Sequence, residues 1–244
     1  MPLLAPQPRS VAPTVDLIVL AGGRGSRLGG VLKPAVELAG RTLLSRVLDA
    51  GGLARRVVVV GPDAARHAAG PQSAPLVWAL EDPPFGGPVA GIIAGLAALD
   101  RAALDQAALD QAAGVDPALA GSSWLLVLAC DLPWAADAAR LLVAAVTDPA
   151  PGSQQLDGLH LVDAGGREQW LAGIYRGEAL RDSVRRLGSE ARGASVRQLL
   201  SGLSLRGIPD AERAGRDVDT WQDVQESTAL LNPSRSNPPR SDIP

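Results

Sequence analysis

Short runs of mostly apolar residues, each ended by turn residues, recur along this 244-residue chain. The first run, Val15 to Ala21, ends at Gly22-Gly23, and two similar runs are Arg56 to Val60 and Trp124 to Ala129. Runs of four to eight apolar residues bounded in this way are typical of parallel strands buried on both faces. We therefore expect three central strands here, with Leu76 to Leu80 as a weaker fourth.

Apolar residues at helical spacing lie between and after these strands. The spacing predicts helices over Thr42 to Leu53, Gly91 to Leu99, Ala136 to Val146 and Ser195 to Leu200. Helices that alternate with buried strands predict an α/β fold in three layers, with a doubly wound, mostly parallel sheet and ligands at the carboxyl ends of the strands.

The later part of the chain predicts a hairpin and a simple domain organisation. Gly158 to Val162 and Gln169 to Tyr175 are expected to be strands joined by a turn at Asp163 to Gly166. We expect one domain over residues 15–231, with disordered tails at 1–14 and 232–244. Residues 98–113 repeat an Ala-Leu-Asp pattern every five residues, which predicts a low-complexity helical insertion at the surface.

Composition excludes several classes of function. A net charge of -3 and a pI near 5.4 argue against sequence-independent nucleic-acid binding, which needs a basic patch. The chain has one cysteine, Cys130, and so neither an internal disulfide nor a cysteine-rich zinc site. No run reaches the roughly 18 apolar residues of a membrane span, and the first fourteen residues lack the apolar core of a signal peptide. We expect a cytoplasmic protein that does not bind membranes.

The first strand is followed by a glycine-rich segment, Leu20 to Lys33, that reads LAGGRGSRLGGVLK. Glycines let backbone N–H groups approach phosphate oxygens, and Arg and Lys supply positive charge. Two common phosphate loops do not fit, because a dinucleotide fingerprint from Gly23 needs glycine at Leu28 and a P-loop from Gly25 needs lysine at Val31. A tight turn with solvated arginines is the other interpretation.

Lys33 stands out by composition, since it is the only lysine among 23 basic residues. A compact ammonium near phosphate would explain why a chain that otherwise uses arginine has a lysine here. Chance retention is the alternative.

The segment resembles the signature of the molybdenum cofactor guanylyltransferases and other MobA-like NTP transferases, in which Leu-Ala-Gly-Gly is followed by an Arg, a Gly-Gly pair and a Lys. The resemblance covers roughly Val15 to Leu230 and implies a nucleotide-diphospho-sugar transferase-like, Rossmann-like fold. Its further elements are the Gly-Gly-Pro loop at Gly86 to Gly95, Cys-Asp-x-Pro at Asp131, Arg167 to Tyr175, and Asp-Val-Asp-Thr at 217–220.

The resemblance implies a role for particular residues. Arg27, Lys33 and Asp131 would be catalytic, with Arg27 and Lys33 on the phosphates and Asp131 on Mg²⁺. The implied nucleotide-binding residues are Leu20, Ala21, Gly22, Gly23, Lys33, Asp82, Gly87 and Asp131.

Several of these assignments have an ordinary structural alternative. Asp131 follows a strand, where a hard oxygen ligand suits Mg²⁺, but an Asp before Pro133 also suits a helix N-cap. Asp219 is expected to be either a second metal ligand or a cap of the helix that starts near Thr220. Glu81 and Asp82 lie where the resemblance puts base recognition, and a carboxylate there would accept hydrogen bonds from the guanine N1–H and N2 amino groups. A solvated loop acid is the alternative for both.

Three positions depart from the family pattern. Leu32 stands where Asp is usual, Trp170 where Pro is usual, and Gly61-Pro62 where an Asn often helps to hold the nucleotide. Leu32 removes a possible hydrogen-bond partner beside Lys33, which puts activity or substrate preference in question.

The resemblance implies a Mg²⁺-dependent transferase that moves GMP from GTP to the molybdenum-bound molybdopterin cofactor and releases pyrophosphate. Arg167 to Tyr175 would form part of the acceptor site, and contacts with molybdenum cofactor biosynthesis or acceptor proteins would be transient. The alternatives are a molybdopterin cytidylyltransferase, another NTP transferase acting on a sugar phosphate, and a non-catalytic nucleotide-binding protein of the same fold.

Overall fold

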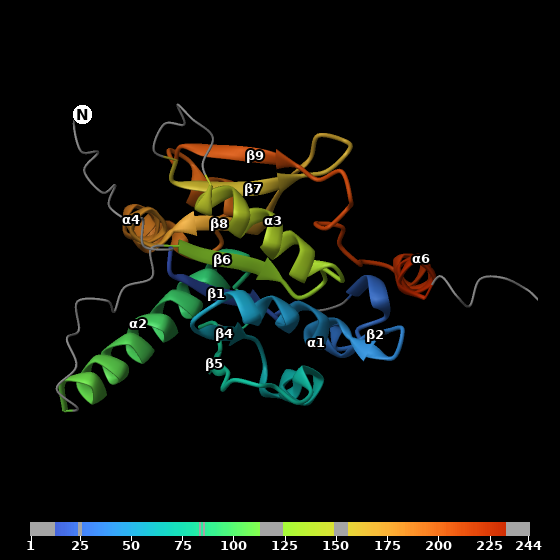
Figure 1. Ribbon diagram of the computed structural model, residues 1–244, viewed down its shortest axis with the longest axis horizontal. Helices are drawn as coiled ribbons and strands as arrows, with labels where there is room; N and C mark the ends of the chain where they lie inside the picture. The colour runs from blue at the N-terminus through green and yellow to red at the C-terminus, as the bar shows by residue number, and fades with distance from the viewer. Residues whose placement is uncertain are drawn as a thin grey trace, which may run out of the picture.

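The computed structural model describes residues 13–23, 26–82, 84, 86–112, 124–148 and 156–232. A central sheet carries helices on both faces (Figure 1). The predicted tails lie almost entirely outside the described residues, as does Ala113 at the end of the predicted insertion.

Seven strands form one sheet within the described part of the chain, in the order β5-β4-β1-β6-β8-β7-β9. Their bounds are β1 Val15–Leu20, β4 Val57–Val60, β5 Val77–Ala79, β6 Trp124–Ala129, β7 Gly158–Val162, β8 Glu168–Arg176 and β9 Leu205–Pro209. Only β8 among these runs antiparallel to its neighbours, so the sheet is mostly parallel, as predicted. A separate small hairpin pairs β2 (Glu37–Leu38) with β3 (Arg41–Thr42).

Helices cover both faces of the sheet, which confirms the three layers. Alternate residues of β1 divide between them: Leu17 and Val19 pack with α1 (Leu43–Val47) and α3 (Ala135–Thr147), and Ile18 packs on the other side. That second side is covered by three helices, α2 Pro88–Ala112, α4 Gly177–Leu187 and α5 Val196–Leu200. Because both faces are buried, the central strands are almost entirely apolar, and the one charged residue of β1, Asp16, is paired with Arg56.

The last helix, α6 (Trp221–Leu231), lies beside β2 at one end of the molecule (Figure 1). A small apolar cluster joins the chain just before α6 to the glycine-rich segment; its buried members are Leu28, Val36, Leu38, Leu43 and Val218. This cluster brings residues near the two ends of the described chain against each other.

Two predicted helices differ in extent from the observed ones. Residues 42–53 form α1 and then a 3₁₀ helix over Leu48–Leu53, which brings Gly51 close to Val57 of β4. Helix α2 begins at Pro88, as proline allows in a first turn, and runs on through the repeat to Ala112. Leu104 and Leu109 are exposed on its far half, which extends away from the sheet (Figure 1). None of the described helices is long and apolar enough to cross a membrane.

Close packing of α2 on β1 depends on Gly95. A Cβ at this position would lie 2.7 Å from Cγ2 of Ile18, a branched side chain with little freedom to move. Overpacking costs about 1–3 kcal/mol, against roughly 1 kcal/mol that alanine gains in a helix. We therefore expect Gly95→Ala to lower the melting temperature.

Gly52→Ala is the matched control, since a Cβ there meets no atom within 4 Å and the backbone needs no left-handed conformation. Its melting temperature should equal or slightly exceed that of the wild type. A Gly95→Ala protein as stable as Gly52→Ala would show that α2 shifts freely on the sheet.

Candidate functional site

The glycine-rich segment leaves the sheet at its centre. The N–H of Ala21 donates to the carbonyl of Val60 (2.7 Å), and the N–H of Cys130 donates to the carbonyl of Leu20 (3.0 Å). A Cβ on Gly61 would lie 2.9 Å from the carbonyl oxygen of Ala21, so the backbones of β1 and β4 approach at their ends in a way that only glycine permits. This packing accounts for the glycine at position 61 of this chain.

Two short 3₁₀ turns carry the cationic residues that follow. Arg27 lies in Ser26–Leu28, fixed by the buried Leu28, and Lys33 begins Lys33–Ala35, fixed by the buried Pro34. Leu32 precedes the second turn, and its carbonyl accepts a hydrogen bond from the N–H of Ala35 (2.8 Å). Residue 32 therefore supports this turn through its backbone.

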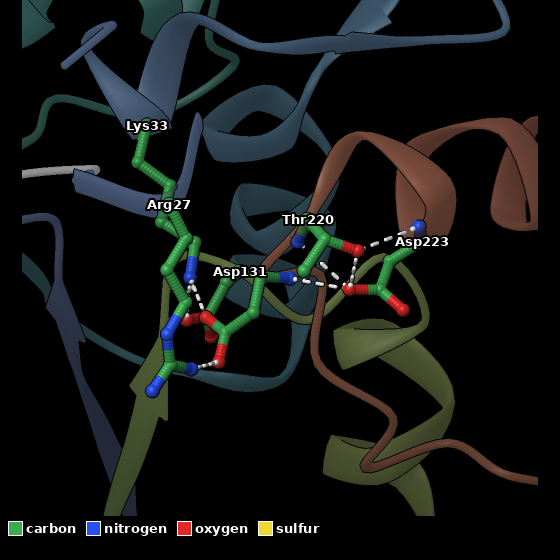
Figure 2. A network of polar contacts seen from close by, with 6 residues as sticks. Arg27, Lys33, Asp131, Thr220 and Asp223 are labelled. Atoms are coloured by element: carbon green, nitrogen blue, oxygen red, sulfur yellow. Dashed lines mark hydrogen bonds and ion pairs between the residues drawn. The ribbon is translucent and has the colours of Figure 1, made fainter. Parts of the chain in front are cut away.

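Four charged side chains from three parts of the chain meet beside this turn, and we call them the charge cluster: Arg27, Lys33, Asp131 and Asp219 (Figure 2). Nζ of Lys33 donates to Oδ2 of Asp131 (2.7 Å) and to Oδ1 of Asp219 (2.5 Å). Nη1 of Arg27 donates to the other oxygen of Asp219, Oδ2 (2.9 Å). The Lys33 side chain is 12% exposed, so the ammonium is held in one place.

Burial and pairing shift the pKa values of the cluster. Burial lowers the pKa of Lys33, but the two carboxylates outweigh it and the pKa is raised overall. Burial raises the pKa of Asp131, against the opposing effect of Lys33. The hydrogen bond from Lys33 lowers the pKa of Asp219. Lys33 is therefore a permanent cation at neutral pH, shared by two acids.

Neither Asp131 nor Asp219 is the N-cap of the helix that follows it. The residue before α3 is Trp134, and the carboxylate of Asp131 bonds Lys33. The N-cap of α6 is Thr220, whose hydroxyl accepts from the N–H of Asp223 (3.2 Å). The carboxylate of Asp219 bonds Lys33 and Arg27.

A cleft of about 670 Å³ lies at the carboxyl ends of β1, β4 and β6. Five of the predicted nucleotide-binding residues line it: Leu20, Gly22, Gly23, Gly87 and Asp131. Ala21 is buried and does not line the cleft. Lys33, Arg27 and Asp219 are also not among its lining residues, but Lys33 bonds Asp131, which is. Leu171 of β8, within the predicted acceptor segment, also lines the cleft.

Of the two candidate base-recognition acids, the structure brings Glu81 to the cleft. Glu81 lines it opposite Gly22, where a Cβ would lie 3.5 Å from Oε1 of Glu81. Asp82 instead lines a neighbouring cavity of about 440 Å³ that also includes Arg101 and Arg192. Adjacent residues of an extended loop face opposite ways, and the sequence alone does not say which one faces the ligand.

Two carboxylates of the charge cluster are of the ligand type that Mg²⁺ prefers, and in this structure both bond Lys33. Asp131 and Asp219 offer hard oxygens that converge on one point, now taken by the ammonium of Lys33. No group of three or more His, Cys, Asp or Glu within the described part of the chain is arranged to hold a metal ion. Two carboxylates with water and substrate phosphates are a usual Mg²⁺ environment in nucleotide enzymes.

The chain is similar in sequence to a known protein family. Residues 17–207 match the family model of the MobA-like NTP transferase domain. The chain is 40% identical over 91 residues to a molybdenum cofactor guanylyltransferase of Rhodopseudomonas palustris, covering 36% of this chain and 42% of that protein. It is 33% identical over 128 residues to the Pseudomonas aeruginosa protein of the same name, covering 52% of each. The matches thus span about half the length of these curated relatives.

A solved structure is similar in fold over most of this chain. Molybdopterin-guanine dinucleotide biosynthesis protein A from Archaeoglobus fulgidus superposes with a TM-score of 0.61 at 20% identity, covering 89% of this chain and 99% of that one. At this identity the match concerns the fold alone, a mostly parallel sheet with helices on both faces.

Proposed function

The chain belongs to the MobA-like NTP transferase family, and from that premise we propose that it is a Mg²⁺-dependent nucleotidyltransferase that transfers GMP from GTP to the molybdenum-bound molybdopterin cofactor. The observation that carries the proposal is that Lys33 is held between Asp131 and Asp219, and that Asp131 lines a cleft together with Gly22, Gly23 and Gly87. The curated relatives named as molybdenum cofactor guanylyltransferases support this donor and acceptor.

The reaction needs no protein nucleophile. A phosphate oxygen of the acceptor attacks the α-phosphorus of GTP and forms the new P–O bond. The bond from the α-phosphorus to the oxygen bridging to the β-phosphorus breaks, and pyrophosphate leaves with that electron pair. Catalysis then consists of in-line positioning and charge neutralisation.

Different residues of the site have different parts in this proposed catalysis. The backbone N–H groups of Gly22 and Gly23 can approach phosphate oxygens, as glycine allows. Lys33 and Arg27 supply positive charge for the phosphates and the leaving pyrophosphate. Asp131 and Asp219 would hold Mg²⁺, which contributes charge neutralisation on the phosphate oxygens when bound. Glu81, which lines the cleft, would accept hydrogen bonds from a guanine edge that cytosine does not present.

The proposal is tested by pyrophosphate release from the purified protein with Mg²⁺ and the molybdenum-bound cofactor, comparing GTP, CTP and ATP in parallel. We expect release with GTP alone and none after EDTA is added. Release with CTP alone would make the protein a cytidylyltransferase. No release with any of the three would contradict transfer to this acceptor, and nucleotide binding without turnover would then identify a non-catalytic binder.

A further inference from the structure

The carboxylate of Asp223 lies beside Thr220, next to the charge cluster (Figure 2), and has no part in the mechanism above. It belongs to the first turn of α6, where it forms a capping box with Thr220. Its Oδ2 accepts from the N–H of Thr220 (2.8 Å) and from the Thr220 hydroxyl (2.7 Å). These bonds alone would make it an ordinary helix-capping residue.

A third hydrogen bond goes beyond an ordinary capping box. The same Oδ2 of Asp223 accepts from the backbone N–H of Asp219 (3.1 Å). Asp219 is the residue whose carboxylate bonds both Lys33 and Arg27. Asp223 therefore fixes the backbone of the acid that holds the two cations of the glycine-rich segment.

The other side of Asp219 is fixed as well. The preceding residue, Val218, is fully buried in the apolar cluster beneath the glycine-rich segment. Its N–H donates to the carbonyl of Asp131 (3.0 Å). Between these two anchors the backbone of Asp219 has little freedom, so its side chain is directed at Lys33.

We infer that Asp223 is a positioning residue of the site, which sets the direction of the Asp219 carboxylate and through it the place of the Lys33 ammonium. The expected effect of Asp223 on turnover rests on the proposed function. Its expected effect on the position of Lys33 does not, because that effect needs no substrate. Residues that orient groups in direct contact with a metal or a substrate typically change affinity or activity by about 10- to 100-fold when mutated.

The chain offers a direct probe of this role, because Lys33 is its only lysine. Lysine labelled with ¹⁵N at Nζ therefore gives a single side-chain ammonium signal, whose chemical shift reports the carboxylates around it. In Asp223→Ala we expect this signal to shift and the rate of pyrophosphate release at saturating GTP to fall by about 10- to 100-fold. In Asp223→Asn the side-chain oxygen still accepts hydrogen bonds, so both readouts should remain near the wild-type values.

The second capping box of the described chain supplies the control. In α5 the side chain of Gln198 accepts from the N–H of Ser195 (2.8 Å), and the Ser195 hydroxyl accepts from the N–H of Gln198 (3.2 Å), outside the cleft. Gln198→Ala should lower the melting temperature about as much as Asp223→Ala and leave the Lys33 signal and turnover unchanged. If loss of the α6 cap unfolds the protein, Asp223→Glu keeps the charge at the helix start and should still shift the signal.

A Lys33 signal in Asp223→Ala that coincides with the wild-type signal would overturn the positioning role, as would an equal shift in Gln198→Ala. A wild-type protein that releases no pyrophosphate would contradict the proposed function instead. The Nζ signal would still decide the role of Asp223 in that case, since it needs no turnover.

Discussion

Lys33→Ala is expected to slow pyrophosphate release by about a thousandfold while the protein stays folded, the size of effect seen when a preorganised donor to transition-state charge is removed. The ammonium is 12% exposed and fixed by two carboxylates, so neither water nor a distant arginine replaces it. Its loss also leaves Asp131 and Asp219 facing each other without the cation between them. The measurement is the steady-state rate with GTP, Mg²⁺ and the acceptor.

Arg41→Ala is the matched control for loss of a paired cation. Arg41 forms a two-point ion pair with Asp49 (both 2.8 Å), but both side chains are about half exposed and lie outside the cleft. Exposed pairs contribute little, so turnover should stay near the wild-type rate. Equal rates in Lys33→Ala and Arg41→Ala would show that the solitary lysine has no part in the reaction.

Asp131→Asn is expected to reduce turnover by about a hundredfold to a thousandfold, because the amide keeps the size of the side chain but carries no charge for Mg²⁺ or Lys33. The Mg²⁺ concentration for half-maximal rate should rise in this variant. Lys33→Ala should instead raise the KM for GTP. A Mg²⁺ titration of both variants separates the two roles.

Asp137→Asn serves as the control for Asp131→Asn, since Asp137 is an exposed acid of α3 that pairs with the neighbouring Arg140. Its Mg²⁺ dependence should match that of the wild type. An unchanged Mg²⁺ dependence in Asp131→Asn would mean that this carboxylate does not hold the metal.

The central strands were predictable because both of their faces are buried, so that their residues are apolar apart from Asp16, which pairs with Arg56. Val15–Leu20 and Trp124–Ala129 needed no tertiary information. Strand β9 was not predicted, because Gly207 interrupts its apolar pattern. This glycine is needed for packing, since a Cβ at position 207 would lie 2.5 Å from Cγ2 of Val162 in the neighbouring strand. Helix α4 does carry its apolar residues at helical spacing, Leu180, Val184 and Leu187, and the sequence analysis missed it.

Motif and composition predicted candidate residues for the site, but not the contacts between them. Lys33 and Asp219 are 186 positions apart, and no local pattern indicates that they share a hydrogen bond. The choice between Glu81 and Asp82 depends on which way each side chain leaves an extended loop. The role of Asp223 follows only from a hydrogen bond to a backbone N–H.

The most direct test of nucleotidyl transfer by this site follows the phosphorus atoms of GTP. With GTP labelled at the α-phosphate, the wild-type protein should place the label on the acceptor, and with GTP labelled at the γ-phosphate the label should appear in pyrophosphate. Lys33→Ala should do neither at a comparable rate. Label from the γ-phosphate appearing as inorganic phosphate or on the acceptor would contradict the account, because the bond broken would then be the one between the β- and γ-phosphates.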